Sequence, residues 1–120
     1  MKFVGKREAP MTLSKQRKLL GNHLNFAAAE AYKLLRTNLM FALPNNNECR
    51  VIGITSALRG EGKSTTSVNL AYTIAQTGER VLMIEADMRL PNVAQRLALR
   101  PTLGLSDLLA GLCTREEAIQ

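Results

Sequence analysis

Residues 56–65 read SALRGEGKST, directly after the apolar run from Val51 to Thr55 and directly before a stretch of helical character. A Walker A phosphate loop forms in this strand–loop–helix context. Its glycines let the backbone turn back on itself, so that successive N–H groups point inward at an anion. The positive N-terminal end of the following helix faces the same anion. The stretch therefore predicts a nucleotide-binding site on an α/β fold.

Individual positions of the loop have expected tasks. Lys63 can reach the outer phosphates, and the hydroxyl of Ser64 can bind a magnesium ion. Ala57 departs from the full G-x-x-x-x-G-K-[ST] pattern, which has glycine at that position. The residues that we expect to contact the nucleotide are Arg59, Gly60, Glu61, Gly62, Lys63, Ser64 and Thr65.

Length and composition indicate one globular domain at most. The chain has 120 residues, of which 46% are hydrophobic and 22% charged, as in ordinary soluble proteins. No apolar run approaches the roughly 18 residues that a transmembrane helix needs, and the N-terminus lacks the apolar region of a secretory signal. We therefore expect a cytoplasmic protein. Cys49 and Cys113 lie far apart, so we interpret them as incidental thiols and expect no metal or redox site.

The net charge of +6 is concentrated in an N-terminal arm, residues 1–24. Residues 1–20 hold six basic side chains against the single acid Glu8, which gives +5. Such an arm is typically solvated and flexible, and contact with an anionic membrane surface or an acidic partner is the alternative. Because repeated aromatic residues for base stacking are missing, we do not expect a nucleic acid partner.

The segment from Phe26 to Leu43 predicts a helix that Asn25 caps and Pro44 ends. Ala28, Tyr32, Leu35 and Leu39 recur at the spacing of one apolar face, and Glu30, Lys33 and Arg36 share a neighbouring polar face. Residues 45–48 form a turn cluster.

Two strands are expected on either side of the helix that follows the loop. Residues 50–55 predict the first, residues 64–77 the helix with Gly78 as its C′ residue, and residues 81–84 a second strand buried on both faces. The helix should bury Val68, Leu70, Ala71, Ile74 and Ala75. A right-handed crossover would make the strands parallel, with both C-terminal ends at the loop. Two strands alone are too few for a stable sheet.

The second predicted strand ends in two acids. Glu85 and Asp87 project to the same side of an extended chain, beside the nucleotide. They could bind Mg²⁺, or one could accept a proton from an attacking hydroxyl. Arg89 could contact phosphate or pair with Asp87. Short helices are expected over 91–99, with Pro91 in the first turn, over 105–109, and from the capping box at Thr114.

Several separate blocks, in order, resemble the bacterial tyrosine kinases of capsular and exopolysaccharide synthesis. These blocks are EAYKLLRTN (30–38), GEGKS (60–64), NLA (69–71), IEADMRLP (84–91) and GLSDLLAG (104–111). The resemblance implies a P-loop NTPase-like parallel sheet flanked by helices, and a cytoplasmic kinase that uses Mg²⁺ and ATP to phosphorylate tyrosines of its own kind. It also implies a homo-oligomer, and a membrane polysaccharide co-polymerase as activating partner and link to the membrane.

The resemblance also implies residue roles. Lys63 and its loop would hold the phosphates, Ser64 and Asp87 would bind magnesium, and Glu85 with Asp87 would serve the attacking tyrosine. In the helix over 26–43, Glu30 and Arg36 match an E-x-x-R-x-x-R motif used in ring assembly. Lys33 replaces its first arginine and loses the planar fork of a guanidinium.

The chain departs from this family in four places. Glu85 replaces the usual aspartate, which lengthens the acid by one methylene, and Leu58 with Arg59 replaces a common proline. The chain stops before the family's Walker B strand, and the tyrosine-rich tail is absent; Tyr32 and Tyr72 look like packed helix residues. We therefore interpret residues 25–120 as the truncated N-terminal part of a P-loop kinase domain, and expect no robust autokinase activity.

Two alternative functions remain. A partitioning or septum-positioning P-loop ATPase would carry a second lysine early in the loop, where this chain has Leu58. A non-catalytic module that binds nucleotide or self-associates would need no complete catalytic apparatus.

Overall fold

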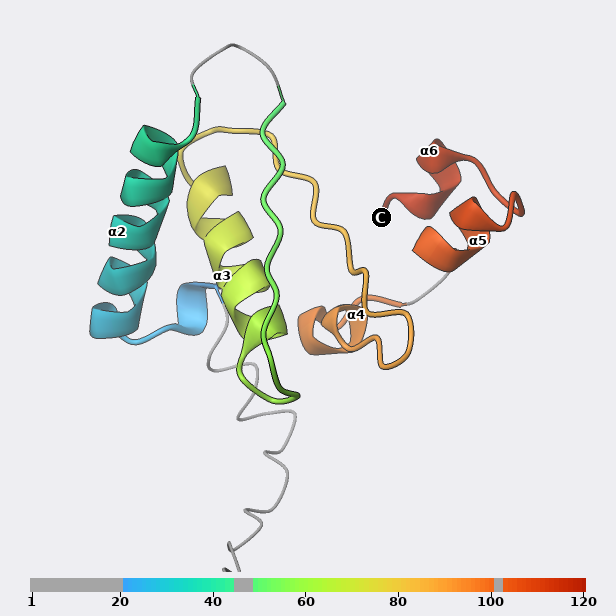
Figure 1. Cartoon of the computed structure of the whole chain (residues 1–120), viewed down its shortest axis with the longest axis horizontal. Helices are drawn as coiled ribbons and strands as arrows, with labels where there is room; N and C mark the ends of the chain where they lie inside the picture. The colour runs from blue at the N-terminus through green and yellow to red at the C-terminus, as the bar shows by residue number, and fades with distance from the viewer. Residues whose placement is uncertain (1–20, 45–48, 101–102) are drawn as a thin grey trace, which may run out of the picture.

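The computed structural model describes residues 21–44, 49–100 and 103–120 (Figure 1). The first 20 residues of the predicted arm and the predicted turn at 45–48 lie outside the described residues. The elements are η1 (Gly21–His23), α2 (Phe26–Ala42), α3 (Lys63–Ala75), α4 (Val93–Leu97), α5 (Leu105–Leu109) and α6 (Arg115–Ala118).

The predicted helices after residue 25 are confirmed, with small shifts at their ends. The Asn25 side chain accepts the N–H of Ala28 at 2.8 Å and caps α2, as expected. The helix after the loop begins one residue early, at Lys63, and ends at Ala75; Gly78, at φ 88°, closes a further turn instead of serving as C′. Pro91 precedes the N-cap Asn92, so it lies outside α4 rather than in its first turn.

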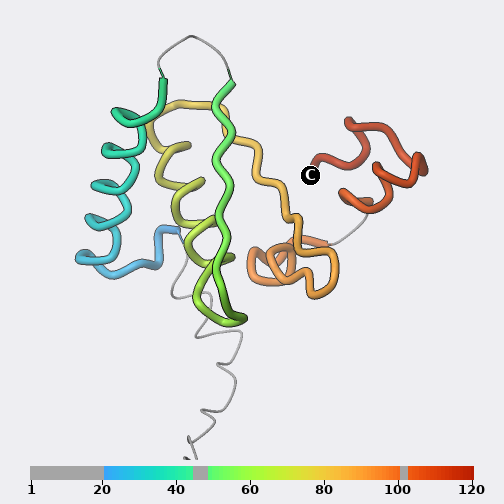
Figure 2. Tube along the Cα trace, in the orientation of Figure 1, coloured from blue at the N-terminus to red at the C-terminus, as the bar shows by residue number. Residues whose placement is uncertain are grey.

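The predicted parallel sheet is not observed in the described part of the chain, where no residue is assigned to a strand. Residues 49–56 and 79–87 are extended and run in the same direction toward the same end of the molecule (Figure 2). A strand needs a neighbouring backbone with which to form its ladder of hydrogen bonds, and neither segment has one here. The direction agrees with the crossover that we expected, but the pairing is missing.

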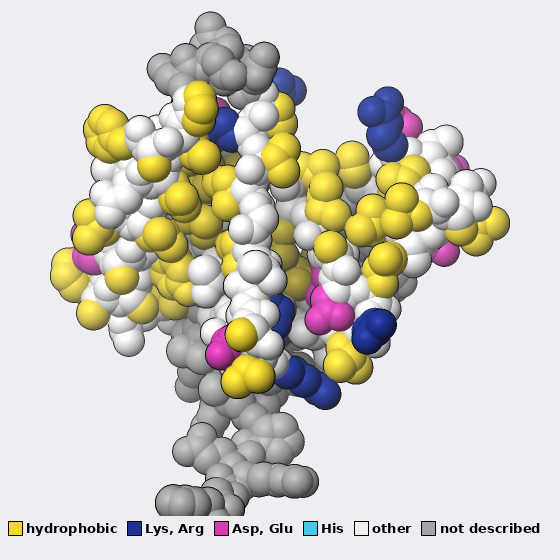
Figure 3. Space-filling model, viewed as in Figure 1, with side chains coloured by type: hydrophobic (Ala, Val, Ile, Leu, Met, Phe, Trp, Pro, Cys, Tyr) yellow, Lys and Arg dark blue, Asp and Glu magenta, His cyan; other side chains and the backbone are white. Residues whose placement is uncertain are grey.

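The same lack of partners corrects the expected burial of residues 81–84. The side chains of Leu82 and Ile84 are both 61% exposed, and only Met83 packs inward, against Val68 and Val93. Figure 3 shows such apolar side chains exposed over the extended segments. Apolar surface of this extent is stabilising only where another element covers it.

The best-packed element is α3, which lies beside α2 and η1 (Figure 1). Val68 and Leu70 are buried as expected, Ala71 and Ile74 are half-buried, and Ala75 is exposed. Two polar residues, Asn69 and Thr73, are also buried, which the apolar pattern did not predict. Asn69 is fully buried, and its Oδ1 accepts the N–H of Gly21 at 2.8 Å, which compensates the cost of burying the amide. Residues 21–24, the last of the predicted arm, thus belong to the folded part.

Candidate nucleotide-binding site

Two glycines give the phosphate loop its shape. Gly60 has φ 87° and Gly62 has φ 92°, in the left-handed region that other residues rarely adopt. A Cβ atom built on either glycine would meet nothing within 4 Å, so the backbone angle and not space requires glycine there. Gly62 is also the N-cap of α3, so the loop passes directly into the helix. The local conformation is the one expected of a phosphate cradle.

Side chains of the loop brace it from within. The ammonium of Lys63 donates to Ser56 Oγ at 3.0 Å and to the Leu58 carbonyl at 3.5 Å, and Ser56 Oγ donates to the same carbonyl at 2.9 Å. The N–H of Leu58 donates to Glu61 Oε2 at 3.0 Å. Lys63 therefore lies across the concave side of the loop, and Glu61 stabilises the turn with its carboxylate.

The first turn of α3 supplies further donors. The N–H of Thr66 makes the first intrahelical bond, to the Gly62 carbonyl at 2.8 Å. The amides of Lys63, Ser64 and Thr65 precede that bond and belong to the N–H groups that a helix leaves without internal partners. Together with the helix dipole and the Lys63 ammonium, they form a site for an anion such as a phosphate. The residues present therefore fit a nucleotide phosphate chain.

Basic side chains gather at this end of the molecule (Figure 3). Arg59 and Arg89 are exposed, and neither forms an ion pair within the described residues. The pairing of Arg89 with Asp87, one of the two expected alternatives, is therefore not observed there. The guanidinium of Arg96, on α4, donates to Thr65 Oγ1 at 2.9 Å. Sequence reasoning missed Arg96, because it lies 31 positions after Thr65 and no local pattern connects the two residues.

The two acids after residue 84 point to different partners. Both oxygens of Glu85 accept backbone N–H groups at the start of α4, from Asn92 at 2.8 Å and from Val93 at 3.1 and 3.2 Å. Asp87 is exposed, and its Oδ1 accepts the N–H of Leu90 at 3.2 Å. Glu85 thus holds α4 in place instead of lying free beside Asp87.

The predicted magnesium ligands are Ser64 and Asp87. Ser64 and Asp87 offer the hard oxygens that Mg²⁺ prefers. However, no group of three or more His, Cys, Asp or Glu side chains among the described residues could hold a metal ion. The assignment of Ser64 and Asp87 as magnesium ligands therefore stays a prediction.

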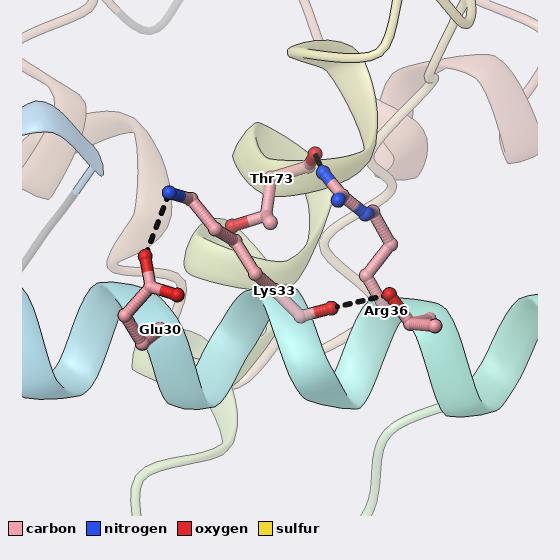
Figure 4. Close-up of polar contacts among 5 residues, drawn as sticks. Glu30, Lys33, Arg36 and Thr73 are labelled. Atoms are coloured by element: carbon pink, nitrogen blue, oxygen red, sulfur yellow. Dashed lines mark hydrogen bonds and ion pairs between the residues drawn. The ribbon is translucent and has the colours of Figure 1, made fainter.

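The predicted assembly residues on α2 have partners within the chain (Figure 4). Lys33 Nζ bonds Glu30 Oε1 at 2.8 Å, and both side chains remain about half exposed, at 50% and 47%. Arg36 instead reaches across to α3, where its Nη1 donates to the Thr73 carbonyl at 2.8 Å. Thr73 lies in the last turn of α3, so its carbonyl is one of the four that a helix leaves without internal partners. Arg36 therefore caps the C-terminus of α3.

Among the helices that the structure describes, none combines the length and the apolar character needed to cross a membrane. Partial burial, with smaller effects from the carboxylates of Asp107 and Glu117, raises the pKa of the Cys113 thiol above its ordinary value.

Comparison with known proteins adds independent findings. Residues 49–119 match the AAA domain family, which covers the loop, α3 and everything to α6. The chain is 44% identical over 92 residues to the tyrosine-protein kinase YwqD of Bacillus subtilis, covering 77% of this chain and 38% of that protein. It is 42% identical over 101 residues to the tyrosine-protein kinase wzc of Salmonella typhi, covering 81% and 14%.

A third relative, the succinoglycan biosynthesis transport protein ExoP of Rhizobium meliloti, is 45% identical over 65 residues, which cover 54% of this chain and 8% of that protein. The chain thus spans well under half of the length of these relatives. No solved structure matches it.

Proposed function

The chain belongs to the AAA domain family and, within it, to the bacterial tyrosine-protein kinases, and we propose that it acts as the nucleotide-binding part of an ATP-dependent tyrosine autokinase. The observation that carries this proposal is the loop over 56–65, where Gly60 and Gly62 at positive φ lead into α3 with Lys63 across the loop. A P-loop NTPase fold follows from the family, and its parallel sheet remains part of the proposal.

The proposed roles follow from the loop's geometry. Lys63 exchanges its contacts with Ser56 and Leu58 for the outer phosphates, and the amides of residues 63–65 bind the phosphate oxygens. Arg59 lies exposed at the edge of the loop and adds positive charge. Magnesium, when bound, neutralises phosphate charge, and we propose Ser64 and Asp87 as its ligands.

Catalysis in this chain meets an obstacle at Glu85. Its two oxygens accept the amides of Asn92 and Val93, so a contact with an attacking tyrosine would compete with the hydrogen bonds that hold α4. We therefore expect the chain to bind nucleotide with little autokinase activity. This observation also favours the second candidate, a non-catalytic nucleotide-binding module. The partitioning ATPase is disfavoured because its second loop lysine is replaced by Leu58.

The partners are proposed from the relatives. ExoP is named for succinoglycan biosynthesis and transport, which supports a role in capsular or exopolysaccharide synthesis and an activating membrane polysaccharide co-polymerase. We propose a cytoplasmic position beside that partner, with the basic residues of the arm facing the anionic membrane surface. The exposed pair of Glu30 and Lys33 on α2 is the proposed contact for a homo-oligomer.

Nucleotide titration tests the proposal. Lys63→Met should weaken binding of a fluorescent ATP analogue at least about tenfold, because a charge-assisted contact with phosphate is lost. Arg80→Met removes an exposed charge elsewhere and should leave affinity unchanged. Equal affinity of the Lys63→Met and wild-type chains would contradict the phosphate-loop assignment. Strong tyrosine phosphorylation of the wild-type chain with labelled ATP would contradict the expectation of little autokinase activity.

A further inference from the structure

Arg96 is a half-buried cation on α4 that the proposed roles above do not use. Its Nη1 donates to Thr65 Oγ1 at 2.9 Å, and within the described residues it forms no ion pair with a carboxylate. Thr65 is the third residue of α3, one position after Ser64. A partly buried guanidinium without an acidic neighbour is costly unless hydrogen bonds or an anion compensate it. Its position at the loop therefore points to the phosphate site.

The Thr65 hydroxyl has a distinctive bonding state. Three hydroxyls in α2 and α3 donate to a carbonyl four residues earlier: Thr37 to Lys33, Ser67 to Lys63 and Thr73 to Asn69. Among the described residues, Thr65 Oγ1 makes no such bond and instead accepts from Arg96. A hydroxyl has one proton to donate, and the guanidinium that occupies its acceptor side cannot receive it. That proton therefore remains available for an anion at the N-terminus of α3.

Two contacts hold α4 in the position that makes this bond. Glu85 binds the N–H groups of Asn92 and Val93 at its start, and the Val93 side chain is buried against Val68 of α3. The bond from Arg96 to Thr65 completes the connection. The second extended segment is thus linked through α4 to the first turn of the phosphate-loop helix.

We propose that Arg96 is a positioning residue of the nucleotide site, which orients the Thr65 hydroxyl so that it donates to a phosphate oxygen, with Glu85 holding α4 in register. This inference rests on the proposed nucleotide binding and adds a specific pair of residues to it. It also gives a role to glutamate in place of the usual aspartate at position 85, because the Glu85 carboxylate binds the first amides of α4.

A double-mutant cycle on nucleotide affinity tests the pair. Arg96→Met and Thr65→Val should each weaken binding of the fluorescent ATP analogue about tenfold, since each removes the same charge-assisted arrangement. The double variant should lose little beyond the larger single effect, because the residues act as one unit. Thr65→Ser keeps the hydroxyl and should bind within about threefold of wild type, which a merely structural role of the threonine methyl would not allow.

Controls separate this inference from the proposed function. Arg80→Met should bind as wild type, and far-UV circular dichroism verifies that each variant is folded; Arg96→Lys, which keeps the charge, replaces Arg96→Met if the latter is unfolded and should also weaken binding. Independent, multiplied losses near a hundredfold in the double variant would overturn the pairing. Loss of binding in Lys63→Met with unchanged affinity in Arg96→Met would overturn the inference alone. A wild-type chain that binds no nucleotide would overturn both.

Discussion

The contact between Arg36 and α3 makes a quantitative prediction about stability. Arg36→Met keeps the apolar stem of the side chain and removes the guanidinium that donates to the Thr73 carbonyl at 2.8 Å. A hydrogen bond to a charged group contributes about 1.5–3 kcal/mol, and a cation at a helix C-terminus adds about 0.3–1 kcal/mol. The variant should therefore lose about 2–4 kcal/mol of unfolding free energy.

Lys33→Met is the matched control on the same helix. It removes the same charge, but its ion pair with Glu30 joins two side chains that are about half exposed, at 50% and 47%. Such a pair contributes only about 0.2–0.5 kcal/mol. The two variants should thus differ by about 2 kcal/mol, which at about 4 °C per kcal/mol corresponds to about 8 °C of melting temperature.

Thermal and urea denaturation followed by circular dichroism measure the difference. Equal stability of the Arg36→Met and Lys33→Met variants would refute the assignment of Arg36 as a cap of α3. Sedimentation of the same samples adds a second readout. If Arg36→Met altered only the association state and left unfolding unchanged, the residue would serve assembly between chains and not packing within one.

Three further predictions follow from single residues. Gly62→Ala places a Cβ at φ 92° and should cost about 1–2 kcal/mol and weaken nucleotide binding, whereas Gly53→Ala, without positive φ and with open space around it, should be neutral in the same assays. Asn69→Leu leaves the N–H of Gly21 without its acceptor and should cost about 1–3 kcal/mol; a smaller change in urea denaturation would contradict the role of that bond. The raised pKa of Cys113 keeps its thiol protonated to higher pH, so the midpoint of its alkylation-rate profile should lie above that of a free cysteine, and Asp107→Asn should lower it; an unchanged midpoint in that variant would refute the carboxylate's contribution.

The local features that sequence patterns predicted correctly are those that depend on neighbouring residues. Gly60 and Gly62 have positive φ angles because the turn requires a conformation that other residues adopt only with strain. The Asn25 cap is a hydrogen bond between residues three positions apart. The blocks that predicted the kinase family also lie in or beside such local structure. Short-range geometry depends on the types of residues close together in the sequence, so it can be predicted without knowledge of the fold.

The partners of long side chains required the tertiary structure. Arg36 was expected on a polar face of its helix and Arg96 was given no role, but each donates across to α3. Glu85 was expected to face the nucleotide beside Asp87, and it binds the start of α4 instead. An extended side chain reaches several residues in many directions, so only the packing of helices decides which acceptor it meets.

By itself, the sequence determined the phosphate loop, the helices and the family, because their signals are local or shared with relatives as blocks. The tertiary structure decided that α3 is capped by Arg36, that Arg96 meets Thr65, and that residues 50–55 and 81–84 do not pair in the described chain. Apolar, β-branched residues favour an extended backbone, whereas a ladder needs a second backbone at hydrogen-bonding distance. The propensity for an extended backbone is therefore a property of the segment itself, whereas sheet formation depends on which segments pack beside it.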